Sequence, residues 1–124
     1  MESKKKPRSY LNKTGRRIIG GKSYYFRSSW EMRFAFYLQL LKRAEEILDW
    51  EYEPHTFWFE GIKRGCVSYK PDFRIFKKDG KHYWVEVKGY MDAKSKTKIK
   101  RFAKYFPEEE LRIIDKSWFS KNKI

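Results

Sequence analysis

The chain has 124 residues, enough for one domain, and its 30 Lys and Arg against 16 Asp and Glu give a formal net charge of +14. This charge favours a polyanion such as a nucleic acid as the partner. A single cysteine excludes an intramolecular disulfide and a zinc site built from thiolates, and no apolar run is long enough to span a bilayer.

Residues 1–21 are predicted to form a basic, flexible arm before one folded domain over residues 22–124. Seven Lys and Arg stand against one Glu in residues 1–17. Such an arm can add phosphate contacts in a DNA-binding protein, and the alternative is a solvated tail. The candidate DNA-binding residues within it are Lys4, Lys5, Lys6, Arg8, Arg16 and Arg17. Because the arm lacks an apolar stretch of signal-peptide length, we expect an intracellular, cytoplasmic protein.

A helix is predicted over residues 28–48, because apolar residues recur there at helical spacing. Glu31 falls in its first turn and has two interpretations. In a Ser-x-x-Glu capping box, its carboxylate would bond back to the amide of Ser28. If Ser29 is the N-cap instead, Glu31 is free to reach a metal ion.

Three strands are predicted next, over residues 56–59, 67–76 and 83–88, with a break in the second at Pro71. The last two are joined by a turn at residues 77–80, since its Asp-Gly pair readily adopts positive φ. We therefore expect these two strands to be neighbours in the sheet.

This pairing places charged residues at adjoining positions of one sheet face. Alternation puts Glu86 and Lys88 on the same side of their strand, and the hairpin brings Asp72 beside them. Buried carboxylates need a cation, which Lys88 or a metal could supply. The alternative is an outer strand with a surface contact between Glu86 and Lys88.

A second helix is predicted from Asp92 to about Phe106, followed by a strand over residues 111–114 and a basic tail of uncertain structure. The candidate DNA-binding residues on this helix are Lys94, Lys96, Lys98, Lys100 and Arg101. Like charges four residues apart are mildly destabilising, which favours an anionic partner over a merely solvated face. The order of elements predicts one α/β domain with a mixed sheet.

Four stretches, residues 27–31, 50–54, 69–73 and 84–89, resemble motifs of the PD-(D/E)xK nuclease superfamily. They include Pro71-Asp72-Phe73 and Glu86-Val87-Lys88-Gly89. Within the superfamily, the chain is most similar to the phage-type endonuclease I family of Holliday-junction resolvases. The resemblance implies a restriction-endonuclease-like domain with a mixed central sheet flanked by helices.

The resemblance also implies roles by position. Asp72 and Glu86 would ligate Mg²⁺ or Mn²⁺ together with the Val87 carbonyl, and Glu31 would be the helix carboxylate of the site. Lys88 would orient the attacking water and stabilise the transition state. The candidate catalytic residues are thus Glu31, Asp72, Glu86 and Lys88, and Arg27 joins the candidate DNA-binding residues.

The function implied is a metal-dependent, structure-selective DNA endonuclease that hydrolyses phosphodiester bonds in branched DNA. Resolvases of this family are homodimers, so a homodimer is expected, and a phage-encoded member would act inside a host cell. Two alternatives stay open. One is a nuclease subunit of a larger transposition, restriction or repair assembly, and the other is a non-catalytic nucleic-acid-binding module on the same fold.

Overall fold

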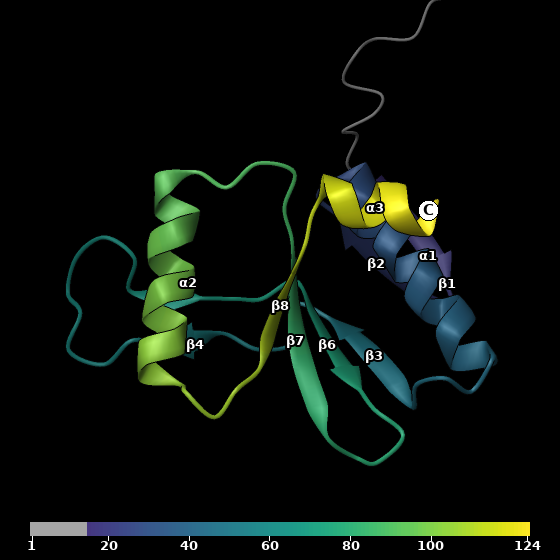
Figure 1. Cartoon of the computed structure of the whole chain (residues 1–124), viewed down its shortest axis with the longest axis horizontal. Helices are drawn as coiled ribbons and strands as arrows, with labels where there is room; N and C mark the ends of the chain where they lie inside the picture. The colour runs from purple at the N-terminus through teal and green to yellow at the C-terminus, as the bar shows by residue number, and fades with distance from the viewer. Residues whose placement is uncertain (1–14) are drawn as a thin grey trace, which may run out of the picture.

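The structure, a computed structural model, describes residues 15–124 and has a mixed α/β fold (Figure 1). Its main sheet contains, in spatial order, β3 (Asp49–Tyr52), β6 (Phe73–Phe76), β7 (His82–Val87) and β8 (Leu111–Ile114). The pair β7 and β8 is parallel, and the other two pairs are antiparallel. The expected α/β domain with a mixed sheet is confirmed.

One face of this sheet packs against α1 (Ser29–Arg43), where the larger apolar core lies. Phe34 of the helix contacts Phe73 of β6 edge-on, with ring centroids 5.2 Å apart. Apolar residues at three- and four-residue spacing share one side of a helix, which explains why this side is buried. Glu31 is the one charged residue among the buried positions of α1.

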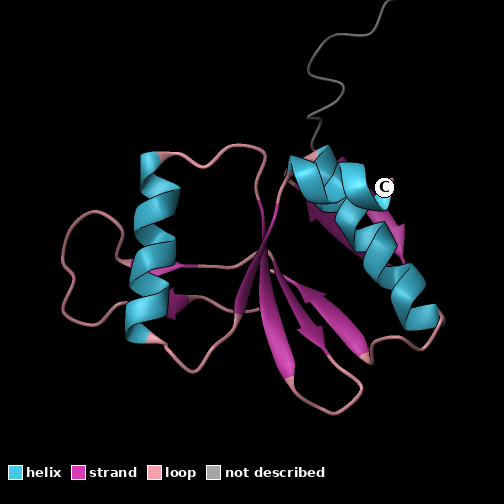
Figure 2. Ribbon diagram, viewed as in Figure 1, coloured by secondary structure: helices cyan, strands magenta, loops and turns pink. Residues whose placement is uncertain are grey.

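The opposite face is covered by α2 (Ala93–Tyr105) and by a small ribbon of β4 (Phe57–Trp58) and β5 (Ser68–Tyr69) (Figure 2). A second apolar core joins the ribbon, the helix and the sheet. Its buried members are Phe57, Phe59, Tyr69, Trp84 and Phe102. The break predicted at Pro71 is confirmed, since it divides the predicted strand over residues 67–76 into β5 and β6.

Residues 15–26 form an antiparallel hairpin of β1 (Gly15–Ile19) and β2 (Lys22–Phe26). Its turn contains Gly20 and Gly21, whose φ values of 59° and 85° suit residues without a side chain. The predicted boundary of the flexible arm at residue 21 falls inside this hairpin. Burial of Ile19 in the larger core anchors this hairpin to the domain.

Helix α1 ends at Arg43, whereas the sequence predicted an end at Leu48. The backbone leaves helical geometry at Glu45, whose φ of 61° lies in the left-handed region. Ile47 is then free to bury its side chain against the core before β3 begins.

The basic tail of uncertain structure contains a helix, α3 (Lys116–Asn122). The Asp115 side chain caps it by accepting a hydrogen bond of 3.1 Å from the backbone amide of Trp118. Phe119 is buried and lies 5.0 Å from the Trp30 ring of α1. Within residues 15–124, no helix combines the length and apolar character needed to cross a membrane.

Candidate active site

A cavity of about 640 Å³ opens where β6 begins and β7 ends, and α1 and α2 contribute to its walls. Its lining includes every residue to which the sequence assigned a catalytic or metal-binding role. These residues are Glu31, Asp72, Glu86, Val87 and Lys88. Residues separated by more than fifty positions therefore line one cavity.

The register of the β6–β7 hairpin places Asp72 beside Glu86. Phe73 pairs with Val85, so the two carboxylate-bearing residues are the next positions along the same strands. Asp72 Oδ2 accepts a hydrogen bond of 2.8 Å from the backbone amide of Val87. Asp72 and Glu86 are each only 8% exposed, which is unusual for ionisable side chains.

Glu31 takes part in the site and lies next to the helix cap. Ser28 is the N-cap, and its hydroxyl accepts a hydrogen bond of 3.2 Å from the Glu31 amide. The Glu31 carboxylate does not return to Ser28 but accepts from the amide of Arg27 at 3.3 Å and from the hydroxyl of Tyr52. Neither interpretation of Glu31 holds as stated, because Ser28 rather than Ser29 is the N-cap and the Glu31 carboxylate does not form the reciprocal bond of a capping box. The carboxylate borders the cavity instead.

Glu53 is a member of the site to which the sequence assigned no role. Carboxylate oxygens of Glu31, Glu53 and Asp72 all lie within 4.8 Å of one another. The Glu53 amide donates to the Asp72 carbonyl at 2.7 Å, so it continues the register of β3 and β6 beyond the last strand residue. Its side chain also pairs with Arg27 at 3.3 Å. No local sequence pattern could have identified Glu53, because its place in the site depends on the pairing of β3 with β6.

The crowded carboxylates have perturbed acidities. Burial, followed by the charges of Glu86 and Glu31, raises the pKa of Asp72 from 3.8 to about 8. Burial also raises the pKa values of Glu31 and Glu86 above their ordinary value. Hard divalent cations such as Mg²⁺ and Mn²⁺ prefer oxygen ligands, and a cation would relieve this repulsion. The donor set therefore fits such a metal ion.

Two side chains contact Glu86 from different directions. The hydroxyl of Tyr69 donates to Oε1 at 2.6 Å, and Lys88 Nζ lies 3.9 Å from Oε2. The hydrogen bond from Tyr69 and the charge of Lys88 favour the ionised carboxylate, although burial outweighs them. Sequence reasoning missed Tyr69, because its approach to β7 depends on how the β4–β5 ribbon packs in three dimensions.

A family model described as "Protein of unknown function (DUF1064)" matches residues 11–122. The chain belongs to this family. No match is found among curated proteins. The four acidic residues of the cavity and Lys88 all lie within the residues that the DUF1064 family model matches.

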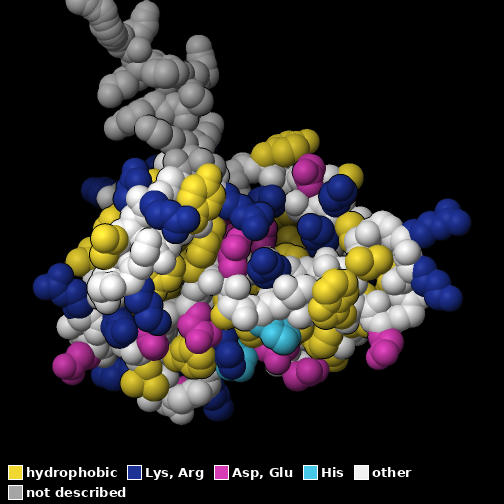
Figure 3. All heavy atoms as spheres, turned by 180° about the vertical axis from the view of Figure 1, so that it is seen from behind, with side chains coloured by type: hydrophobic (Ala, Val, Ile, Leu, Met, Phe, Trp, Pro, Cys, Tyr) yellow, Lys and Arg dark blue, Asp and Glu magenta, His cyan; other side chains and the backbone are white. Residues whose placement is uncertain are grey.

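Four cations of this DUF1064 protein border the same cavity as the four acids. They are Arg27, Lys70, Lys88 and Lys98. Figure 3 shows acidic side chains in a hollow with Lys and Arg side chains beside them. Arg27 and Lys98 were candidate DNA-binding residues, whereas Lys70 was not singled out from the sequence. A divalent cation among the acids would make the whole lining attractive to phosphate.

The other candidate DNA-binding residues have different positions. Arg101 donates from Nη1 to the Cys66 carbonyl at 2.7 Å, so it holds the loop before β5 rather than pointing freely to solvent. Arg16 and Arg17 are exposed on β1, which lies across the molecule from α2 (Figure 1). The candidates that are exposed on α2 are Lys94, Lys96 and Lys100. Outside the described residues are Lys4, Lys5, Lys6 and Arg8.

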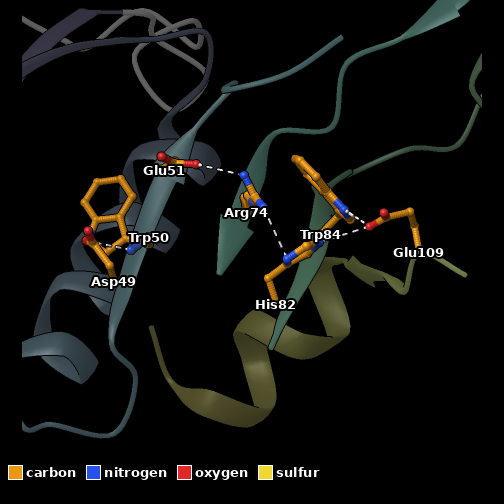
Figure 4. A network of polar contacts seen from close by, with 7 residues as sticks. All are labelled: Asp49, Trp50, Glu51, Arg74, His82, Trp84 and Glu109. Carbon is orange, nitrogen blue, oxygen red and sulfur yellow. Dashed lines mark hydrogen bonds and ion pairs between the residues drawn. The ribbon is translucent and has the colours of Figure 1, made fainter. Parts of the chain in front are cut away.

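A polar network begins two residues along the chain from Asp72 and Glu86, at the paired residues Arg74 and Trp84. Figure 4 shows this network. Arg74 of β6 extends between Glu51, at 3.8 Å, and His82, at 3.3 Å. Glu109 accepts from the Trp84 indole at 2.7 Å and contacts His82 at 3.1 Å. This network links β3, β6 and β7 to the loop before β8, and it therefore fixes the strands that carry the site.

Proposed function

We propose that this chain is a metal-dependent, structure-selective DNA endonuclease that hydrolyses phosphodiester bonds in branched DNA, with Mg²⁺ or Mn²⁺ as its cofactor. The supporting observation is the cavity in which four acidic side chains lie among four Lys and Arg side chains. A surface that only binds phosphate gains nothing from buried acids, since they repel it. Hydrolysis of a phosphodiester needs both acids for a metal and cations for the phosphate.

The acidic residues would hold the cation in this proposal. Glu31, Glu53 and Asp72 offer three clustered carboxylates, and Glu86 and the Val87 carbonyl border the same cavity. When bound, a divalent cation supplies Lewis-acid stabilisation of the charge on the phosphate oxygens.

The remaining side chains position the reactants. Lys88 lies beside Glu86, where its ammonium can orient the attacking water and offset charge that develops on the phosphate. Tyr69 holds Glu86 in place through its hydroxyl. Lys70 and Lys98 border the cavity and can contact backbone phosphates on either side of the reacting one.

A cleavage panel tests this proposal. Duplex, nicked, flap, four-way-junction and single-stranded DNA are each incubated with Mg²⁺, Mn²⁺ or EDTA. We expect cleavage of branched substrates only with a divalent ion. Asp72→Ala and Glu86→Ala should bind DNA without cutting it, whereas Asp79→Ala, in the exposed turn of the hairpin, should cut normally.

Unchanged cutting by both site variants would refute this site, and no cleavage of any substrate with either metal would refute the activity. Size measurement of the free protein in the same buffer tests the expected homodimer.

A further inference from the structure

Trp58 is a large apolar side chain that is exposed inside a polar cavity. It lines the cavity and is 66% exposed. Its neighbour Phe57 points the other way along β4 and is buried against Trp84 and Phe102. The local alternation therefore explains how Trp58 is presented, but the second apolar core does not need its indole ring.

The rest of this ribbon face has the chemistry of a nucleic-acid surface. Ser68 pairs with Trp58 across the ribbon, and Thr56 and Lys70 lie directly before β4 and directly after β5, two positions along the chain from Trp58 and Ser68. All four line the cavity. The wall therefore offers an aromatic ring, two hydroxyls and an ammonium group, which suit a base, sugar or phosphate oxygens, and a phosphate charge, respectively.

We infer that Trp58 stacks on an unpaired base of the DNA strand whose phosphate lies among the acids, which makes DNA with an unpaired nucleotide beside the scissile phosphate the substrate class. This inference rests on the proposed nuclease function. Bases inside an intact duplex stack on each other, so their faces are covered, whereas an unpaired base can offer its face to an aromatic side chain. A flap, a gap or the branch point of a junction supplies such a base.

Charge supports the same occupant. Lys70 and Lys98 border the cavity with Trp58, and the chain as a whole carries a formal charge of +14. A strand that enters this cavity would meet Lys70 beside the ribbon, Lys98 on α2 and the indole ring of Trp58. An apolar ligand is disfavoured, because it would desolvate the carboxylates without satisfying them.

The inference is tested by binding without turnover. Fluorescence anisotropy in EDTA compares a labelled duplex with the same duplex carrying a single-stranded flap, for wild type, Trp58→Ala, Trp58→Phe and Phe36→Ala. Phe36 is a matched exposed aromatic residue on α1, away from this cavity. We expect Trp58→Ala to weaken flap binding by about 5- to 150-fold, which is the range for loss of one base stack, and to change duplex binding little. Trp58→Phe should retain part of the preference for the flap over the duplex, and Phe36→Ala should retain all of it.

Intrinsic fluorescence provides a second measurement. Trp50 and Trp84 are buried, at 4% and 3% exposure, and Trp30 and Trp118 are half-buried against the larger core. The part of the quenching by a single-stranded oligonucleotide that is lost in Trp58→Phe therefore reports contact with Trp58. Thermal denaturation checks that Trp58→Ala is folded. Equal flap preference in wild type and Trp58→Ala would overturn the inference. Binding that depends on Trp58, without cleavage in any divalent ion, would support stacking and refute the nuclease proposal instead.

Discussion

Asp72 accepts a hydrogen bond of 2.8 Å from the backbone amide of Val87, fifteen residues along the chain. This bond joins the start of β6 to the end of β7, so the main chain of the sheet sets the position of the carboxylate. The Asp72 side chain is buried and lies close to the carboxylates of Glu86 and Glu31. The fold therefore holds an acid in a place where it is electrostatically unfavourable without a cation.

The first prediction concerns stability against pH in the metal-free protein. The pKa of Asp72 is raised from 3.8 to about 8, so between these values the native state binds more protons than the unfolded state. The stabilising contribution is complete below about pH 4 and is lost as the pH rises through about 8. We expect the free energy of unfolding in EDTA to fall over this range.

Denaturation in urea at several pH values checks this expectation, with Asp72→Asn as the reference. Neutral Asp and Asn are similar, so wild type and variant should be about equally stable near pH 4, and the variant should become the more stable one towards pH 8. Mg²⁺ should restore wild-type stability at pH 8 and have little effect on the variant. A stability difference that is constant with pH would contradict the raised pKa.

The second prediction separates the two roles at the start of α1. Ser28→Ala removes the cap to the Glu31 amide and should lower the free energy of unfolding by about 0.5–2 kcal/mol. Glu31→Gln keeps the backbone cap but removes a buried charge, so the metal-free protein should keep or gain stability at pH 8. Calorimetric titration with Mn²⁺ should show weaker binding for Glu31→Gln and near-normal binding for Ser28→Ala. The reverse pattern would make Glu31 a capping residue only.

The third prediction concerns the hydroxyl that positions Glu86. Tyr69→Phe removes the hydrogen bond of 2.6 Å while leaving the ring in the second core. Removing a side chain that orients a metal-binding carboxylate typically lowers metal affinity or activity by about 10- to 100-fold. We expect the DNA cleavage rate of Tyr69→Phe to fall by this factor at low Mg²⁺ and to recover in part at high Mg²⁺. Tyr83→Phe, which removes a hydroxyl from a half-buried tyrosine of β7, is the control and should behave as wild type.

Much of the site geometry follows from local rules. The Asp79-Gly80 turn predicts the β6–β7 hairpin, and alternation along its strands puts Asp72 and Glu86 on one face. Asp92 predicts the start of α2 through a side-chain cap, and its carboxylate accepts from the Ser95 amide at 2.8 Å. These features depend on residues that are close in sequence, so the sequence pattern alone suffices for them.

What the sequence could not predict depends on distant packing. Helix α3 is short and basic, and its place depends on Phe119 packing against Trp30 of α1. Tyr69 reaches Glu86 only because the β4–β5 ribbon packs between α2 and the sheet. Glu53 joins the site through the pairing of β3 with β6, which no local pattern specifies.

The last prediction uses the backbone of Glu53. Its φ of 47° is in the left-handed region, which is unfavourable for a residue with a side chain and is tolerated where the surroundings impose it. Glu53→Gly should relieve this strain and the carboxylate repulsion, and so raise the stability of the metal-free protein at pH 8 by up to about 1 kcal/mol. The same change should weaken Mn²⁺ binding, because one of the three clustered carboxylates is lost.

Glu45→Gly is the matched control, since Glu45 has a φ of 61° but is exposed at the end of α1. It should gain stability by a similar amount and bind Mn²⁺ as wild type does. Urea denaturation in EDTA and calorimetric titration measure both effects on the same samples. Loss of stability in Glu53→Gly, with Mn²⁺ binding intact, would mean that Glu53 serves its ion pair with Arg27 rather than the metal. The expected opposite changes in stability and binding would instead identify the left-handed Glu53 as a residue whose backbone strain is retained for the site.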